Sequence, residues 1–235
     1  MKTNSNSYTI IYSVVLVLIV AFLLAFVSKS LEGKQNANIA LDKKKQILYS
    51  LNIRNITNEQ AEAQYKKVVE ADEIIDANYK ILASGTPGGE KDGFSLNSAD
   101  QASGKLALFV CKVNGMRKYV IPLYGMGLWG GISGYIALDE DKETVYGVYF
   151  NHESETAGLG AEIKDSQSWQ EKFQGKKLFK AGDEKSISLS VNKKIEDTST
   201  QVDAITGATL TSNGVTDMLH SCLERYLTFL NLNDK

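Results

Sequence analysis

The stretch Leu106-Ala-Leu-Phe-Val-Cys-Lys-Val-Asn-Gly-Met-Arg-Lys-Tyr-Val-Ile121 decides the fold of this 235-residue chain. Its two runs of apolar and β-branched residues, 106–113 and 118–121, flank the dipeptide Asn114-Gly115. Asn-Gly readily adopts the left-handed backbone that a two-residue hairpin turn needs, so the stretch predicts a pair of antiparallel strands.

More strands are expected downstream of this hairpin. Residues 133–138 and 145–150 are strand-like and are joined by the acidic turn 139–142, while the shorter segments 177–179 and 187–191 look extended. Together with the hairpin they predict a largely antiparallel sheet, which will carry the usual twist.

Helical periodicity surrounds this sheet in the sequence. Apolar residues recur at helical spacing over residues 41–51, 59–82 and 215–230, and residues 169–173 resemble one short helical piece. Asn58 is a plausible N-cap for the second of these helices, and the lysine run 43–45 reads as a solvated face. The predicted fold class is α+β, a largely antiparallel twisted sheet with flanking helices.

A membrane-spanning helix is expected before the sheet. Ile10 to Val27 is an uncharged 18-residue run interrupted only by Tyr12 and Ser13. At about 1.5 Å per residue it reaches the roughly 30 Å of a bilayer core. A cleaved signal peptide is the alternative, but residues 26–30 make a poor cleavage site. The lysines that follow the run do not support translocation of the C-terminal region.

The pattern divides the chain into three parts. Residues 1–30 are the N-terminal tail and transmembrane anchor, residues 31–83 a helical segment, and residues 84–235 the α+β domain, which opens with the polar, glycine-rich loop 84–104. The net charge of −2 does not indicate the excess of basic residues that is typical of nucleic-acid-binding proteins. Two His and two Cys are too few for most metal sites, so the chemistry is expected from an organic cofactor, with no catalytic side chain and no metal.

A hydroxyl-rich stretch precedes the last predicted helix. It reads Asp203-Ala-Ile-Thr-Gly-Ala-Thr-Leu-Thr-Ser-Asn-Gly214. The pair Gly207-Ala208 presents the Thr209 hydroxyl just before a helix N-terminus, where unpaired N–H groups favour a phosphate. Thr211 or Ser212 serving as N-cap is the simpler alternative, although it leaves the longer pattern unexplained.

Two loops combine glycine with bulky apolar residues. Residues 122–134 contain five Gly around Leu128 and Trp129, which suits a flat aromatic ligand; a glycine-rich turn with Trp129 as a core residue is the alternative. In residues 152–162, Leu159 lies between two glycines. An apolar side chain in such a loop is expected to pack against a partner, such as a bound ligand. His152 in that loop is weak evidence for a metal and is expected at the surface.

The two cysteines fall in different predicted elements. Cys111 lies in a strand and Cys222 in the last helix. A disulfide would require an oxidising compartment and a suitable separation, so two separate buried thiols are the simpler expectation.

These motifs resemble a known family. Residues 203–209 are similar to the flavinylation motif Asp-x-x-(Ser/Thr)-Gly-Ala-Thr of bacterial FMN-binding domains, and residues 125–129 and 155–160 look like two further family blocks. With the anchor and the lysine-containing helix after it, nearly the whole chain resembles the C subunits of the Na⁺-translocating NADH:quinone reductase. One departure is Ala157, where the family often has proline.

The resemblance implies covalent FMN on residues 84–235. A separate flavin transferase would attach FMN by a phosphoester to Thr209, and the flavin would relay electrons from NADH toward quinone in a sodium pump. The implied environment of the phosphate and ring consists of Thr206, Gly207, Ala208, Leu210, Thr211, Ser212, Leu128, Trp129, Glu155, Thr156, Gly158 and Leu159.

The resemblance also implies partners and a location. The partners are the other subunits of a membrane complex and membrane lipid. The protein would be single-pass in the bacterial cytoplasmic membrane, with its soluble domain on the periplasmic side. Three alternatives are a flavinylated subunit of an Rnf-type ferredoxin:NAD complex, a non-redox membrane-anchored binding module, and a free-standing flavin reductase.

Overall fold

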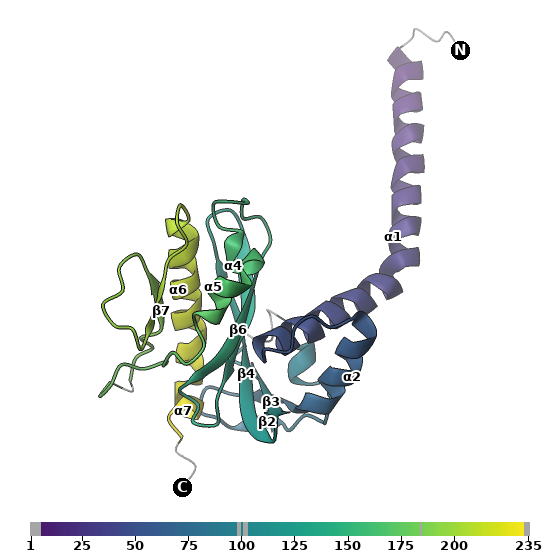
Figure 1. The fold of residues 1–235 in the computed structure, drawn as a ribbon. Helices are drawn as coiled ribbons and strands as arrows, with labels where there is room; N and C mark the ends of the chain where they lie inside the picture. The colour runs from purple at the N-terminus through teal and green to yellow at the C-terminus, as the bar shows by residue number, and fades with distance from the viewer. Residues whose placement is uncertain (1–5, 98–99, 101–102, 184, 233–235) are drawn as a thin grey trace. The chain divides into compact units, whose positions relative to one another are not determined.

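The computed structural model describes residues 6–97, 100, 103–183 and 185–232. Compactness divides the chain between Lys43 and Lys44 into two units, which are described separately. Helix α1 (Asn6–Ser50) begins in the first unit, and its last turns belong to the second (Figure 1).

The first unit consists of the apolar part of α1. Within the described residues, α1 is the one helix long and apolar enough to cross a membrane, by length and composition alone. The large apolar side chains between Ile10 and Val27 are exposed along the helix, as expected for a segment that lacks protein neighbours. This agrees with the predicted apolar span.

The second unit is built on a six-stranded antiparallel sheet of order β2-β1-β3-β4-β5-β6 (Figure 1). The strands are β1 (Val69–Ile75), β2 (Ile81–Ala83), β3 (Leu106–Val113), β4 (Met116–Met126), β5 (Gly131–Leu138) and β6 (Val145–His152). The predicted hairpin is confirmed: Asn114 and Gly115 join β3 to β4 with positive φ angles of 51° and 82°. Two positive φ values in succession are the backbone of a type I′ turn.

Helices cover both faces of the sheet (Figure 1). One face packs against the end of α1 and helix α2 (Asn58–Val68), which contribute the fully buried Ile47, Leu48 and Tyr65. The other face packs against helix α6 (Thr209–Leu223) and helix α5 (Gln167–Glu171), whose Trp169 contacts Phe150 of β6. The predicted α+β class with flanking helices is therefore confirmed.

Shorter elements complete the unit. They are the 3-10 helices η1 (Gly93–Ser95) and η2 (Glu224–Tyr226), the helices α4 (Glu162–Asp165) and α7 (Leu227–Leu230), and the strands β7 (Ser190–Asn192) and β8 (Gln201–Asp203). Strands β7 and β8 form a separate parallel pair. Only the end of the predicted extended segment 187–191 is thus a strand, and of residues 177–179 only Lys177 forms a β-bridge.

The predicted helix over residues 59–82 is wrong in its second half. The helix ends at Val68, and Val69 begins β1, which pairs with β3 along its whole length. The N-cap is Thr57 rather than Asn58: its hydroxyl accepts the N–H of Gln60, whose side chain accepts the N–H of Thr57. This reciprocal capping box fixes the start of α2.

The lysine run after the apolar segment is not a uniform solvated face. Lys44 is 3% exposed and forms ion pairs with Glu62 of α2 at 2.8 Å and Glu90 at 2.7 Å. Burial alone would lower the pKa of Lys44, but these two carboxylates reverse the effect and raise it. Lys44 therefore ties the end of α1 to α2.

The outer edge of β6 is covered by the loop between α1 and α2. The side-chain amide of Asn52 donates to the Tyr146 carbonyl at 2.8 Å, and Arg54 donates to the Val148 carbonyl at 2.9 Å. Exposed strand edges invite pairing with other chains, so these two side chains protect the sheet.

The two cysteines are separate free thiols, as expected, although only Cys111 is fully buried. Cys111 lies in β3, and burial raises the pKa of its thiol. The Cys222 sulfur of α6 accepts the Tyr124 N–H, and its thiol donates to the Tyr124 carbonyl, at 3.3 Å each. These bonds give partners to the backbone of β4 where it extends beyond its pairing with β3.

Candidate functional site

Helix α6 begins at Thr209, six residues earlier than the sequence predicts. Its N-cap is Ala208, which has no side-chain capping bond, so neither Thr211 nor Ser212 is the cap. Threonine, serine and glycine have low helix propensity, yet the helix forms because its inner face is buried against the sheet. Gly214 allows this contact: a Cβ there would lie 2.3 Å from the Met126 carbonyl oxygen.

The hydroxyl groups of the stretch have different environments. Thr211 and Ser212 are buried, and their hydroxyls have protein partners: Thr211 donates to Glu155 at 2.6 Å, and Ser212 accepts the N–H of Ile205 at 3.3 Å. Thr209 is half-buried and Thr206 exposed. Among the residues that the structure describes, none hydrogen-bonds to either of these two hydroxyls.

Hydrogen bonds fix the first residues of the segment that precedes α6. The Trp169 indole N–H donates to the Asp203 carbonyl at 2.8 Å, and the Ala204 N–H donates to the Asn192 carbonyl at 2.9 Å. Gly207 then turns the chain with a φ of 82°. The indole bond could not be predicted from the sequence, because Trp169 reads only as an apolar residue of a short helix.

The first glycine-rich segment forms the turn between β4 and β5. The Gly127 N–H donates to the Gly130 carbonyl at 2.8 Å, which closes a tight hairpin over residues 127–130. Leu128 and Trp129 project from its tip and are 42% and 65% exposed. The alternative of Trp129 as a core residue is therefore wrong.

The second segment is the loop that follows β6. Its Leu159 is 50% exposed, and Thr156 and Gly158 are exposed as well. A Cβ added to Gly207 would have the Gly158 carbonyl oxygen at 3.7 Å and the Leu159 side chain at 3.8 Å as its neighbours. This loop therefore lies beside the segment that precedes Thr209.

His152 has a structural contact in the same loop. Its Nδ1 accepts the N–H of Glu155 at 3.2 Å. No group of His, Cys, Asp and Glu suited to hold a metal occurs in the described part of the chain.

Glu155 joins the three segments. It is 6% exposed, its Oε1 accepts the Trp129 N–H at 2.9 Å, and its Oε2 accepts the Thr211 hydroxyl at 2.6 Å. Burial tends to raise the pKa of this carboxyl, but the Thr211 hydroxyl and the N–H groups of Trp129, Leu128 and Gly130 outweigh burial and lower it. The side chain is therefore a carboxylate at neutral pH.

The predicted site residues thus fall into two groups. Ala208, Thr211, Ser212 and Glu155 are buried. The remaining predicted residues are at least partly exposed: Leu128, Trp129, Thr156, Gly158, Leu159, Thr206, Gly207, Thr209 and Leu210. Three segments distant in sequence therefore present exposed apolar side chains next to a helix N-terminus.

This surface fits a flat aromatic ligand that carries a phosphate. The first N–H groups of an α-helix lack intrahelical partners and favour an anion, and α6 starts without a side-chain cap. An apolar surface for the ring of such a ligand is also present. It consists of the exposed side chains of Leu128, Trp129, Leu159 and Leu210.

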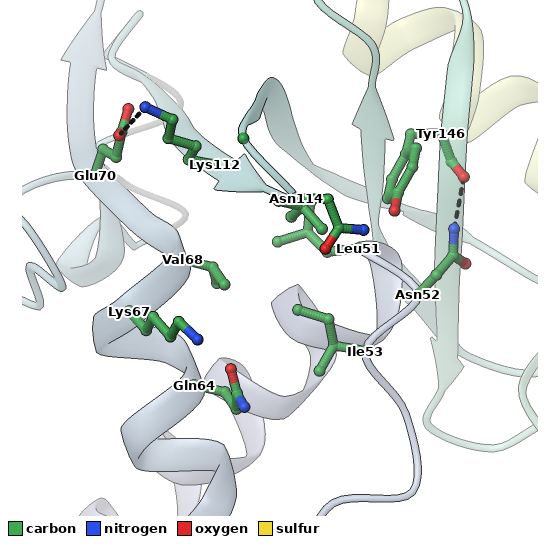
Figure 2. Close-up of a pocket in the computed structure, with 12 residues that line it drawn as sticks. Leu51, Asn52, Ile53, Gln64, Lys67, Val68, Glu70, Lys112, Asn114 and Tyr146 are labelled. Atoms are coloured by element: carbon green, nitrogen blue, oxygen red, sulfur yellow. Dashed lines mark hydrogen bonds and ion pairs between the residues drawn. The ribbon is translucent and has the colours of Figure 1, made fainter.

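A separate groove lies elsewhere in the second unit (Figure 2). It has a volume of about 630 Å³ and is lined by residues that include Gln64 and Lys67 of α2, Asn114 of the hairpin turn, and Tyr146. None of the residues predicted from the sequence to bind the cofactor is among those that line it. The groove and the predicted cofactor surface are therefore different places on this unit.

Residues 127–224 match the family model described as the FMN-binding domain. The chain is 31% identical to the C subunit of the Na(+)-translocating NADH-quinone reductase of Haemophilus ducreyi, over 90% of this chain and 87% of the relative. It belongs to the family of C subunits of the Na⁺-translocating NADH-quinone reductase.

Solved structures agree with this assignment. The C subunit from Parabacteroides distasonis superposes with a TM-score of 0.77 at 36% identity, over 87% of this chain and 98% of that chain. Shewanella oneidensis NqrC superposes with a TM-score of 0.65 at 22% identity, over 83% of this chain and 98% of that chain, which supports the fold.

Proposed function

We propose that this protein carries FMN, attached by a phosphoester to Thr209, and transfers electrons as a subunit of a Na⁺-translocating NADH:quinone reductase. The observation that carries the proposal is the placement of Thr209. It is the first residue of α6, its hydroxyl has no partner among the described residues, and the helix that it begins lacks a side-chain cap.

Attachment requires a nucleophilic oxygen with space around it. With FAD as donor and a separate flavin transferase as catalyst, the Thr209 oxygen forms a bond to the FMN phosphorus while the phosphoanhydride bond of FAD breaks. AMP leaves, and the hydroxyl proton is released. Gly207 supports access, because a Cβ there would still have no neighbour closer than 3.7 Å.

The phosphate would be held by the first turn of α6. Backbone N–H groups at a helix N-terminus and the helix dipole both favour a negative charge there. The predicted role of Thr211 is therefore assigned to its backbone N–H, since its hydroxyl donates to Glu155. Ser212 has no free group for the phosphate, because its hydroxyl accepts the Ile205 N–H and its own N–H donates to the Ala208 carbonyl at 2.9 Å.

The ring would lie against the exposed apolar side chains. Leu128 and Trp129 on one loop, Thr156 and Leu159 on another, and Leu210 on the helix would flank it and exclude water. The bound flavin supplies reversible acceptance and release of electrons, and the protein supplies orientation and electrostatic surroundings.

The proposal includes the setting of this domain. The apolar part of α1 would anchor the protein in the cytoplasmic membrane, in contact with lipid and with the other subunits of the complex. The compact unit from Lys44 onward, which contains residues 84–235, would lie on the periplasmic side. Electrons would pass from NADH toward quinone by way of this flavin. The family assignment and the apolar helix support this setting.

Two substitutions at one position test the attachment. Thr209→Val keeps the shape of the side chain but replaces the hydroxyl with a methyl group, whereas Thr209→Ser keeps a hydroxyl. Co-expressed with a flavin transferase, the native chain and Thr209→Ser should be fluorescent after denaturing electrophoresis, and Thr209→Val should be dark. A fluorescent Thr209→Val chain would contradict the assignment, and a colourless native chain would favour a non-redox binding module.

A further inference from the structure

Glu155 is the meeting point of three segments that contribute to the proposed flavin site. Its Oε1 accepts the N–H of Trp129 in the β4–β5 hairpin, and its Oε2 accepts the hydroxyl of Thr211 in the first turn of α6. Its own N–H donates to the His152 ring. One buried carboxylate therefore links the hairpin, the loop after β6 and the helix that carries Thr209.

The surroundings of this carboxylate have no room for a ligand. A Cβ on Gly127 would lie 2.4 Å from its Oε1, and a Cβ on Gly160 would lie 2.8 Å from its Oε2 and 2.6 Å from the Thr211 hydroxyl oxygen. Glycine is required at both places because the carboxylate occupies the space. With 6% exposure and both oxygens engaged by the protein, Glu155 offers a flavin very little surface.

The bonds are of a strong kind. Hydrogen bonds to an ionised acceptor are shorter and stronger than those between neutral groups, and burial removes competition from water. Leu128 and Trp129 lie on a four-residue turn that the backbone bond between Gly127 and Gly130 closes. That bond shapes the turn itself, and the close approach of Gly214 in α6 to the Met126 carbonyl holds the base of the hairpin against the helix. At the tip of the turn, Glu155 adds a link to α6 through Trp129 and Thr211.

We propose that Glu155 is a positioning residue: it does not contact the flavin, but fixes the hairpin that carries Leu128 and Trp129 against the helix that carries Thr209. The effect of Glu155 on the flavin rests on the proposed function, whereas its link between the hairpin and the helix does not. Attachment then depends on the Thr209 hydroxyl, and the environment of the ring depends on Glu155.

The two roles can be separated by substitution. Glu155→Ala removes both links, while Thr211→Val removes only the link to the helix and keeps the shape of that side chain. Thr211→Ser restores a hydroxyl at the same place. Glu153→Ala is the matched control, since Glu153 is an exposed carboxylate of the same loop.

The first measurement needs no flavin. Hydrogen exchange of the full-length chain in detergent, produced in a host without the transferase, should show at least tenfold faster exchange at the amides of residues 128–130 in Glu155→Ala. Glu153→Ala should match the native chain. Unchanged exchange in folded Glu155→Ala would overturn the proposal whether or not the protein binds flavin.

The second measurement uses flavinylated protein. Folded Glu155→Ala and Thr211→Val should still acquire covalent flavin, but flavin fluorescence anisotropy should fall and the flavin potential should move toward that of free FMN. Thr211→Ser should restore both values. A potential and anisotropy equal to those of the native chain would overturn the proposal, and so would a folded Glu155→Ala that acquires no flavin, because Glu155 would then serve attachment.

The outcomes distinguish this inference from the proposed function. If the native chain acquires no flavin at Thr209, the proposed function fails while the exchange experiment still tests the positioning role of Glu155. If Glu155→Ala does not fold, Thr211→Val tests the positioning role instead, because it leaves the carboxylate and its bond to Trp129 in place.

Discussion

At the scale of single residues, burial separates hydroxyl groups that look alike in the sequence. Thr209 and Thr211 are two positions apart, so they project from α6 in different directions. Thr211 points inward to Glu155, whereas Thr209 stays half-exposed with no partner among the described residues. The helix geometry thus makes one threonine structural and leaves the other available for modification.

Gly160→Ala tests the packing around Glu155. Gly160 has a φ of 157°, and an added methyl group would clash with the Thr211 hydroxyl oxygen and the Glu155 carboxylate. Overpacking at such a site costs about 1–3 kcal/mol of unfolding free energy. Gly158→Ala is the control, since its φ of 77° brings backbone strain but nothing lies within 4 Å. Equal losses in urea unfolding for the two variants would show that the clash is absent.

The Glu155 carboxyl should also make stability depend on pH. Its pKa is lower in the folded protein than in the unfolded chain, so the folded state favours the ionised form. The stabilisation is therefore complete above the unfolded pKa of about 4.3 and is lost as pH falls through the folded value. Urea unfolding from pH 7 to pH 3 should show a steeper loss for the native chain than for Glu155→Gln. Parallel curves would contradict this.

At the scale of elements, a local signal fixes the start of α2. Thr57→Ala removes the side chain of the capping box and should lower the unfolding free energy by about 1 kcal/mol. Thr57→Ser should retain most of the stability, because its hydroxyl can accept the same N–H. Asn58→Ala, at the position that the sequence suggested as the cap, should have a smaller effect in the same unfolding assay.

How well the sequence predicts an element depends on where its stabilising contacts come from. The β3–β4 hairpin was predictable because Asn114-Gly115 carries the turn signal within the hairpin itself. Residues 69–75 satisfy a helical spacing equally well, and only their pairing with β3, more than thirty residues away, makes them a strand. The early start of α6 likewise depends on contact with Met126 of β4.

The candidate site was predictable to the same extent. Thr209 and its neighbours were identified from a contiguous motif, and the two loops from their glycine and apolar content. The structural role of Glu155 was not predictable, because its partner Thr211 is 56 positions away and no local pattern indicates the contact. The flavin itself was inferred from a family resemblance.

At the scale of the whole molecule, the chain combines an exposed apolar helix with a compact unit from Lys44 onward. A fragment of residues 44–235 should therefore remain monodisperse without detergent, whereas the full chain should require detergent. Size-exclusion chromatography and circular dichroism of both would check this. Aggregation of a correctly folded fragment would indicate that residues before Lys44 cover part of the compact unit.

The central claim is that Thr209 bears the flavin. The most direct test is intact-mass analysis of the native chain from its own membranes, followed by mapping of the peptide that spans residues 203–214. The account predicts a mass increase of one FMN minus one water, located on Thr209. An unmodified Thr209, or the same mass on Thr206 or another residue, would contradict it.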